Sequence, residues 1–174
     1  MTDTINVVIG TALGEIRVAL DAARAPGTVA NFLRYMDGGF YEGGRVHRTV
    51  KPDNQPNNAV KIEVIQAGVA PERESAKFEP LPLERTSVSG LRHVDGAISM
   101  ARSTPDSALA DFFICIGDQP ELDFGGRRNP DGQGFAAFGI VTAGMDVVRR
   151  IQQSPCEEQR LTPPIEIQRI HRIV

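Results

Sequence analysis

Two short apolar segments separated by a polar connection constrain the fold of this 174-residue chain more than any other feature. Small and apolar side chains fill residues 96–101 and 112–116, whereas Ser, Thr, Pro and Asp dominate the connection at 103–110. This pattern predicts two buried strands joined by a loop. A loop between buried strands is a common position for a binding groove.

Phe112 and Phe113 are adjacent, so an extended strand directs their rings to opposite faces of the sheet. One ring can then enter the core while the other lines a binding site. From this segment alone, the simpler interpretation is that both rings belong to the core, and both alternatives stay open at this stage.

Short β-branched segments and evenly spread turn residues, with 17 Gly and 12 Pro, favour a sheet-rich fold along the whole chain. Apolar residues recur at helical spacing in two segments, 28–39 and 145–152. The fold class that this pattern predicts is mainly β: a closed eight-stranded antiparallel β-barrel capped by two α-helices, one at each mouth. We expect a covering loop over 69–95, with a short strand near Leu81. The main strands are expected at residues 6–9, 14–20, 45–50, 60–68, 96–101, 112–116, 135–141 and 163–174.

Composition restricts the domain count, the location and the partners. With 41% apolar residues and no low-complexity segment, a single domain over residues 1–174 is expected. The net charge of -3 and the scattered Lys and Arg exclude a basic stripe, so nucleic acid is not an expected partner. Without a long apolar run or a leader we expect no membrane association and a cytoplasmic location, although a mature secreted or periplasmic form would look the same. No apolar patch is evident, so a monomer is expected.

Common catalytic devices are not recognisable in the sequence. The three histidines are far apart, so no metal site is expected. The glycine pairs do not follow a nucleotide-binding pattern, and Ser99 has no evident base. No disulfide framework is expected, because Cys115 lies in an apolar strand as a small core residue and Cys156 lies in a polar loop.

His47 and Arg48 occupy the centre of a β-branched strand, where two basic groups are unusual. An exposed strand face is the simpler explanation, and a cleft is the alternative. Gln66 shares a strand face with Ile62 and Val64, which suggests a specific hydrogen-bond partner for its amide. One cation, one amide and several apolar residues therefore remain as candidates for a groove: Arg48, Gln66, Met100, Ala101, Phe113 and Leu122.

Eight segments in order resemble the cyclophilin-type peptidyl-prolyl cis-trans isomerases, at close to the same spacing and over nearly the whole chain. They are Thr11-Ala-Leu-Gly-Glu-Ile, Ala25-Pro-Gly-Thr-Val-Ala-Asn-Phe, Val46-His-Arg, Ile65-Gln-Ala-Gly, Gly96-Ala-Ile-Ser-Met-Ala, Phe112-Phe-Ile, Leu122-Asp and Phe138-Gly-Ile-Val. The extended Gly-rich segment 124–134 is similar to that of some bacterial members.

The resemblance implies the same barrel and an isomerase that needs no cofactor and acts on proline-containing peptides or unfolded proteins. By resemblance, Arg48 is the catalytic cation, and the other site residues bind substrate. Those residues are Val64, Gln66, Met100, Ala101, Phe113, Leu122 and Phe135.

The chain departs from the family pattern at several groove positions. Glu63 replaces an aromatic residue, and Val64 replaces a methionine. A catalytically weakened peptide-binding or chaperone-like module is therefore the alternative function, with loop 51–59 as its partner surface. Because the chain has no tryptophan, weak cyclosporin binding is expected. The other departures are Arg102 for an asparagine, Asp111 for a glutamine, Glu121 for a tryptophan and Phe135 for a histidine.

Overall fold

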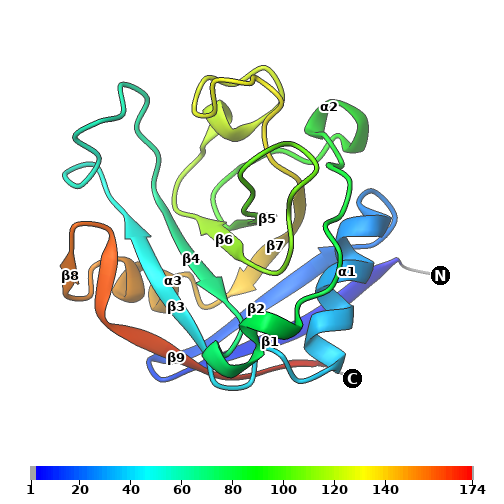
Figure 1. Ribbon diagram of the computed structural model, residues 1–174, viewed down its shortest axis with the longest axis vertical. Helices are drawn as coiled ribbons and strands as arrows, with labels where there is room; N and C mark the ends of the chain where they lie inside the picture. Colours follow the sequence, from blue (N-terminus) through cyan, green and yellow to red (C-terminus); the bar gives the residue numbers. More distant parts are fainter. Residues whose placement is uncertain (1–2, 174) are drawn as a thin grey trace.

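In the computed structural model, which describes residues 3–173, nine strands form one antiparallel sheet that closes on itself (Figure 1). The strands are β1 (Thr4–Thr11), β2 (Gly14–Asp21), β3 (Gly44–Val50), β4 (Val64–Gly68), β5 (Ala97–Met100), β6 (Phe112–Cys115), β7 (Ala137–Ala143), β8 (Cys156–Glu157) and β9 (Arg160–Arg172). β1 pairs with both β2 and β9, which closes a ring in the order β1-β2-β7-β5-β6-β4-β3-β9. The two-residue β8 pairs only with β9 and lies outside the ring. The predicted eight-stranded barrel is therefore confirmed.

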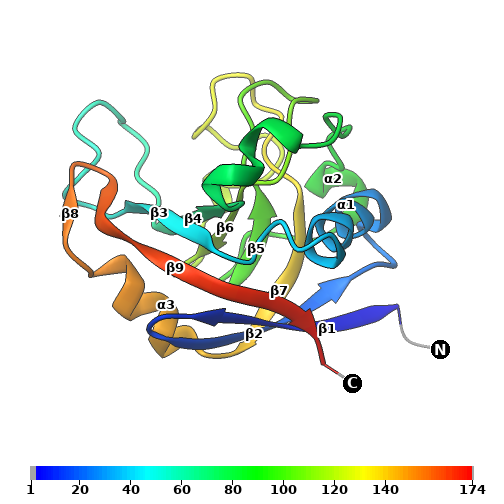
Figure 2. The ribbon, with the colours of Figure 1, turned by 60° about the horizontal axis from the view of Figure 1, so that its bottom comes forward.

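Two helices, α1 (Pro26–Asp37) and α3 (Met145–Gln152), lie at opposite ends of the barrel (Figures 1 and 2). Pro occupies the first turn of α1, where its missing N–H costs nothing, and Gly38 follows the last residue. The predicted covering segment contains the 3₁₀ turn η1 (Pro71–Ala76) and the short helix α2 (Thr86–Ser89). No helix within residues 3–173 is long and apolar enough to cross a membrane.

Phe32 of α1 lies at the centre of the barrel interior, and its side chain has no exposed surface. Its ring lies 5.3 Å from that of Tyr41, 5.5 Å from that of Phe112 and 5.4 Å from that of Phe138, measured between centroids. Such tilted and edge-to-face contacts add to the stabilisation from apolar burial. The helix therefore fixes β6 and β7 from inside one mouth of the barrel.

Strand alternation divides the apolar residues into two clusters. Phe112 and Ile114 of β6 belong to the interior cluster, whereas Phe113 and Cys115 belong to a second cluster on the outer face. The second cluster is Val50, Ile62, Val64, Ala97, Phe113, Cys115 and Leu122, with Ala101 and Phe135 packed against it. Both phenylalanine rings are buried, but on opposite sides of the sheet, as the alternation predicts.

The predicted strand at 60–68 loses more residues than any other. The segment expected at 60–68 joins the sheet only from Val64, because the Gln55 side chain hydrogen-bonds the main chain of Ile62. Gln55 Oε1 accepts from Ile62 N at 3.0 Å, and Gln55 Nε2 donates to Ile62 O at 2.8 Å. These bonds replace those of a neighbouring strand. The short strand expected near Leu81 is reduced to a single bridge between Leu81 and Ala108.

Phe32→Ala should lower the free energy of unfolding by about 3–5 kcal/mol, because it removes a ring that three other rings surround. Urea denaturation monitored by circular dichroism measures the change. Val88→Ala is the matched control, because Val88 is 85% exposed and its truncation should stay within about 0.5 kcal/mol. Equal effects of the two substitutions would contradict the packing described here.

Candidate functional site

A groove with a cavity of about 430 Å³ lies on the outer face of the barrel, over β3, β4 and β6. The second apolar cluster forms its floor, and Phe135 packs edge-on against Phe113 with a centroid distance of 5.6 Å. Charged and polar side chains form its rim. The lining residues are Arg48, Ile62, Val64, Gln66, Lys77, Ala101, Arg102, Ser103, Ser107, Leu109, Asp111, Phe113, Leu122, Arg128, Asn129 and Phe135.

Met100 is the one predicted site residue that does not line the groove. It is 1% exposed and belongs to the interior cluster, because it pairs with Phe112 across β5 and β6 and shares its face. The structure brings the other seven predicted residues together around one cavity: Arg48, Val64, Gln66, Ala101, Phe113, Leu122 and Phe135.

Arg48 reaches the groove because the pairing register of β3 shifts between Val46 and Arg48. A bulge of this kind redirects side chains: Val46 lies in the interior, whereas His47 and Arg48 are both half-buried. The two basic side chains of this strand, His47 and Arg48, thus both lie outside the core.

Neutral oxygens orient the Arg48 guanidinium. Its Nη1 donates to Gln66 Oε1, and its Nε donates to Gln159 Oε1, both at 2.9 Å. Among residues 3–173, no carboxylate forms an ion pair with Arg48. Burial lowers the pKa of Arg48 from its ordinary value. The group therefore faces the groove as a fixed cation without a counterion.

Asp111 continues this network from Gln66. Gln66 Nε2 donates to Asp111 Oδ2 at 3.1 Å, and His47 Nε2 lies 3.0 Å from the same oxygen. Burial alone would raise the pKa of Asp111, but the hydrogen bonds from His47 and Gln66 outweigh it and leave the pKa below its ordinary value. The carboxylate therefore fixes the Gln66 amide so that its oxygen faces Arg48.

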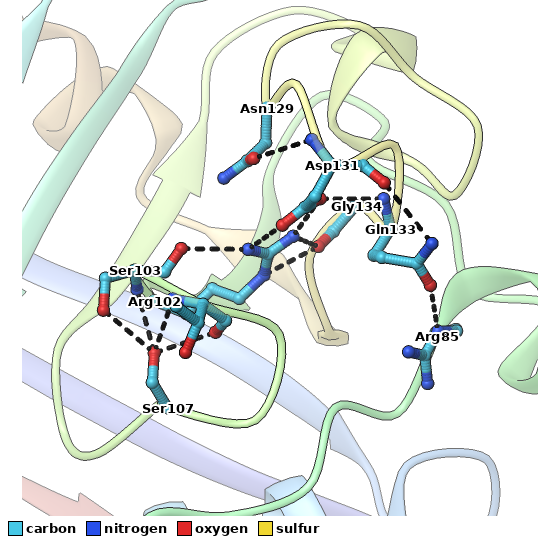
Figure 3. Close-up of polar contacts among 9 residues, drawn as sticks. Arg85, Arg102, Ser103, Ser107, Asn129, Asp131, Gln133 and Gly134 are labelled. Atoms are coloured by element: carbon cyan, nitrogen blue, oxygen red, sulfur yellow. Dashed lines mark hydrogen bonds and ion pairs between the residues drawn. The ribbon is translucent and has the colours of Figure 1, made fainter.

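Arg102 fastens the loop 124–134 beside the groove (Figure 3). Its side chain is 1% exposed, donates to Asp131 Oδ2 at 2.9 Å and to Asp131 Oδ1 at 3.0 Å, and also donates to the carbonyl oxygen of Gly134. The guanidinium lies 4.7 Å from the centroid of the Phe135 ring. Arg102 is thus a structural cation that positions Phe135 as a groove wall.

Two acidic departures from the family pattern lie outside the groove. The Glu63 carboxylate accepts a hydrogen bond from Gln152 Nε2 at 3.1 Å. Glu63 itself does not line the cavity, whereas its neighbours Ile62 and Val64 do. Glu121 forms an ion pair with Arg127 at 2.9 Å. Neither carboxylate lies beside Arg48, so neither neutralises it.

Ser99, His93 and Asp123 are hydrogen-bonded in series beneath the groove. His93 Nδ1 lies 2.7 Å from Asp123 Oδ1, and His93 Nε2 lies 2.8 Å from Ser99 Oγ. This base is not recognisable from the sequence, because His93 lies in the covering segment. His93 is 1% exposed and Ser99 has no exposed surface, so no substrate reaches them. The imidazole stacks on Phe113 with a centroid distance of 6.0 Å, which indicates a supporting role.

Comparisons of sequence identify similar proteins. A family model described as "Cyclophilin type peptidyl-prolyl cis-trans isomerase/CLD" matches residues 5–172. The chain is 35% identical to peptidyl-prolyl cis-trans isomerase A of Dickeya dadantii, over 90% of this chain and 75% of the relative. It is also 35% identical to peptidyl-prolyl cis-trans isomerase cyp18 of Streptomyces antibioticus, over 84% of this chain and 82% of the relative.

Comparisons of structure identify the same fold. A cyclophilin type peptidyl-prolyl cis-trans isomerase of Cryptosporidium parvum superposes with a TM-score of 0.78 at 20% identity, covering 98% of each chain. The structure of that protein in the presence of the dipeptide Ala-Pro gives a TM-score of 0.77 at 21% identity, covering 97% of this chain and 99% of the other.

Asp111→Asn should lower the free energy of unfolding by about 1 kcal/mol near pH 5, because it removes the charge that His47 and Gln66 hydrogen-bond. The pKa of Asp111 is lowered in the folded state, so its stabilisation is present above about pH 4 and is lost as pH falls through the folded pKa. Urea denaturation between about pH 5 and pH 2 should therefore show the two proteins converging. Asp53→Asn, at an exposed position, is the control. A constant difference across this range would contradict the assigned network.

Proposed function

The chain belongs to the cyclophilin-type peptidyl-prolyl cis-trans isomerases, and we propose that the groove around Arg48 is where it accelerates rotation about Xaa-Pro bonds. The observation that carries this proposal is the half-buried Arg48 guanidinium, which neutral oxygens fix beside an apolar cavity. The named isomerases among its relatives favour this function over that of a peptide-binding module without catalysis.

Rotation about a peptide bond is slow because the twisted state loses amide resonance, which gives a barrier of about 18–20 kcal/mol. The prolyl nitrogen becomes pyramidal in that state and gains a localised lone pair. No bond is broken, so the reaction needs neither a nucleophile nor a cofactor. An enzyme accelerates it by binding the twisted state more tightly than either planar isomer.

Arg48 is the group that stabilises the twisted imide. Its Nη2 has no hydrogen-bond partner among residues 3–173, whereas Nε and Nη1 are held by Gln159 and Gln66. A donor fixed in place before the reaction acts on developing electron density without reorganisation. Because no carboxylate pairs with it, the full charge is directed at the prolyl nitrogen.

The apolar floor of the groove binds the pyrrolidine ring. Phe113 and Leu122 form its base, Phe135 forms one wall, and Ile62 and Val64 form the other. Gln66 and the main chain at Ala101 hold the peptide on either side of the ring. Proline-containing peptides are the substrates, as the Ala-Pro dipeptide in the structure of the similar Cryptosporidium parvum protein also suggests. The groove is built within one chain, so isomerisation needs no second copy, and the protein is proposed to act as a monomer.

Arg48→Ala should lower kcat/KM about a hundredfold, because it removes the donor to the pyramidal nitrogen. Arg48→Lys should recover only part of the rate, since an ammonium group lacks the planar fork that donates to Gln66 and Gln159 and still presents a further N–H group to the substrate. Exchange NMR on an Ala-Pro peptide measures the rate. Arg24→Ala removes a cation that is 60% exposed and should leave the rate unchanged. An unchanged rate in Arg48→Ala would contradict the proposal.

A further inference from the structure

Arg128 lines the groove together with the cations Arg48, Lys77 and Arg102, and it comes from loop 124–134 rather than from the barrel. Its Nη1 donates to Gln55 Oε1 and to Val60 O, both at 2.7 Å. These bonds fix the half-buried side chain across the end of the groove where Ile62 lies. Its Nε and Nη2 have no hydrogen-bond partner among the described residues.

Arg128 differs from its charged neighbours in lacking a counterion. Arg102 is paired with Asp131, and Arg127 is paired with Glu121. Within residues 3–173, no carboxylate forms an ion pair with Arg128. Like Arg48, it is held by neutral oxygens and lines the same cavity. Two guanidinium groups without a carboxylate partner among the described residues thus border one cavity.

Two like charges beside one cavity are unfavourable when no anion is present. Burial and then the charge of Arg48 both lower the pKa of Arg128 from its ordinary value. A carboxylate that enters the cavity relieves this repulsion and accepts charge-assisted hydrogen bonds from the free N–H groups.

Among residues 3–173, Asp111 is the only acidic side chain that lines the cavity, and it lies at the end opposite Arg128. Asp111 directly precedes β6 beside the Gly68 end of β4, since Ala67 pairs with Phe112, whereas Arg128 lies near Ile62, before the start of β4. Successive strand residues rise about 3.3 Å, so the length of β4 separates the two groups. An acidic side chain placed at Arg128 therefore does not meet Asp111.

We propose that Arg128 makes this protein selective for prolines flanked by an acidic residue, whose carboxylate binds at the Ile62 end of the groove. This inference rests on the proposed function of the same groove. Arg128 acts on specificity: it binds a neighbouring side chain of the substrate, while Arg48 acts on the prolyl nitrogen.

Two matched pairs of peptides test the selectivity. One pair carries Asp or Asn directly after the proline of Ala-Pro, and the other carries Asp or Asn directly before Ala-Pro. Exchange NMR gives kcat/KM for each peptide, and the ratio of the Asp to the Asn peptide is the readout. In one of the two pairs we expect this ratio to be about ten, and to fall as salt screens the interaction.

Arg128→Gln should bring that ratio close to one, and Arg128→Lys should keep most of it because the charge remains. Arg127→Gln is the matched control: it removes the same charge from the adjacent residue, which is 74% exposed and does not line the cavity. The ratio should persist in Arg127→Gln. The salt dependence in the unaltered protein and the ratio in Arg128→Lys test the proposal even if Arg128→Gln fails to fold.

A ratio within about twofold of one in both pairs, or a ratio that survives Arg128→Gln, would overturn this selectivity. The Asn peptides separate this outcome from a failure of the proposed function. If they are isomerised and no preference for Asp is found, only the role of Arg128 is wrong. If no peptide is isomerised, the groove is not an isomerase site and both proposals fail.

Discussion

Closure of the sheet through the pairing of β1 with β9 is the constraint on which the rest of the structure depends. A closed ring gives every strand residue either an inward or an outward direction. The interior cluster around Phe32 of α1 fills the inside, where the remaining cavity of about 10 Å³ is too small for a ligand. The groove lies on the outer wall, where the alternation that buries Phe112 places Phe113 and Val64, and where the bulge in β3 places Arg48.

On the outer wall, neutral amide groups rather than carboxylates orient the cation Arg48. Amide oxygens of Gln66 and Gln159 fix Arg48, while the carboxylate of Asp111 acts one residue further away. A carboxylate bonded directly to Arg48 would orient it equally well but would cancel the charge that the twisted imide requires. The ion pair of Arg102 with Asp131 shows the other arrangement in the same groove, where the cation supports Phe135 and the loop.

Much of the fold follows from the sequence because strand alternation and helix punctuation are local signals. The two capping helices, the strand order along the chain and the opposite directions of Phe112 and Phe113 were all predictable. The site was predictable in part by resemblance. The motif around Met100 predicts a place in the groove, but its pairing with Phe112 directs the side chain inward.

Other site features depend on contacts between loops, which leave no periodic signal. Ile62 shares a face with Val64 and Gln66, so its place in the groove could have been inferred. Arg128 could not, because its position depends on Gln55, 73 residues away. The position of Glu63 was equally hidden, since it is set by Gln152 of α3.

The most direct test of the central claim, that the outer groove isomerises Xaa-Pro bonds, is NMR of an Ala-Pro peptide mixed with ¹⁵N-labelled protein. The same samples give the cis/trans exchange rate of the peptide and the chemical shift changes of the protein. We expect faster exchange together with shifts centred on Arg48, Gln66, Ala101 and Phe113. Binding shifts at these residues without faster exchange, or faster exchange with shifts confined to another face, would contradict the account.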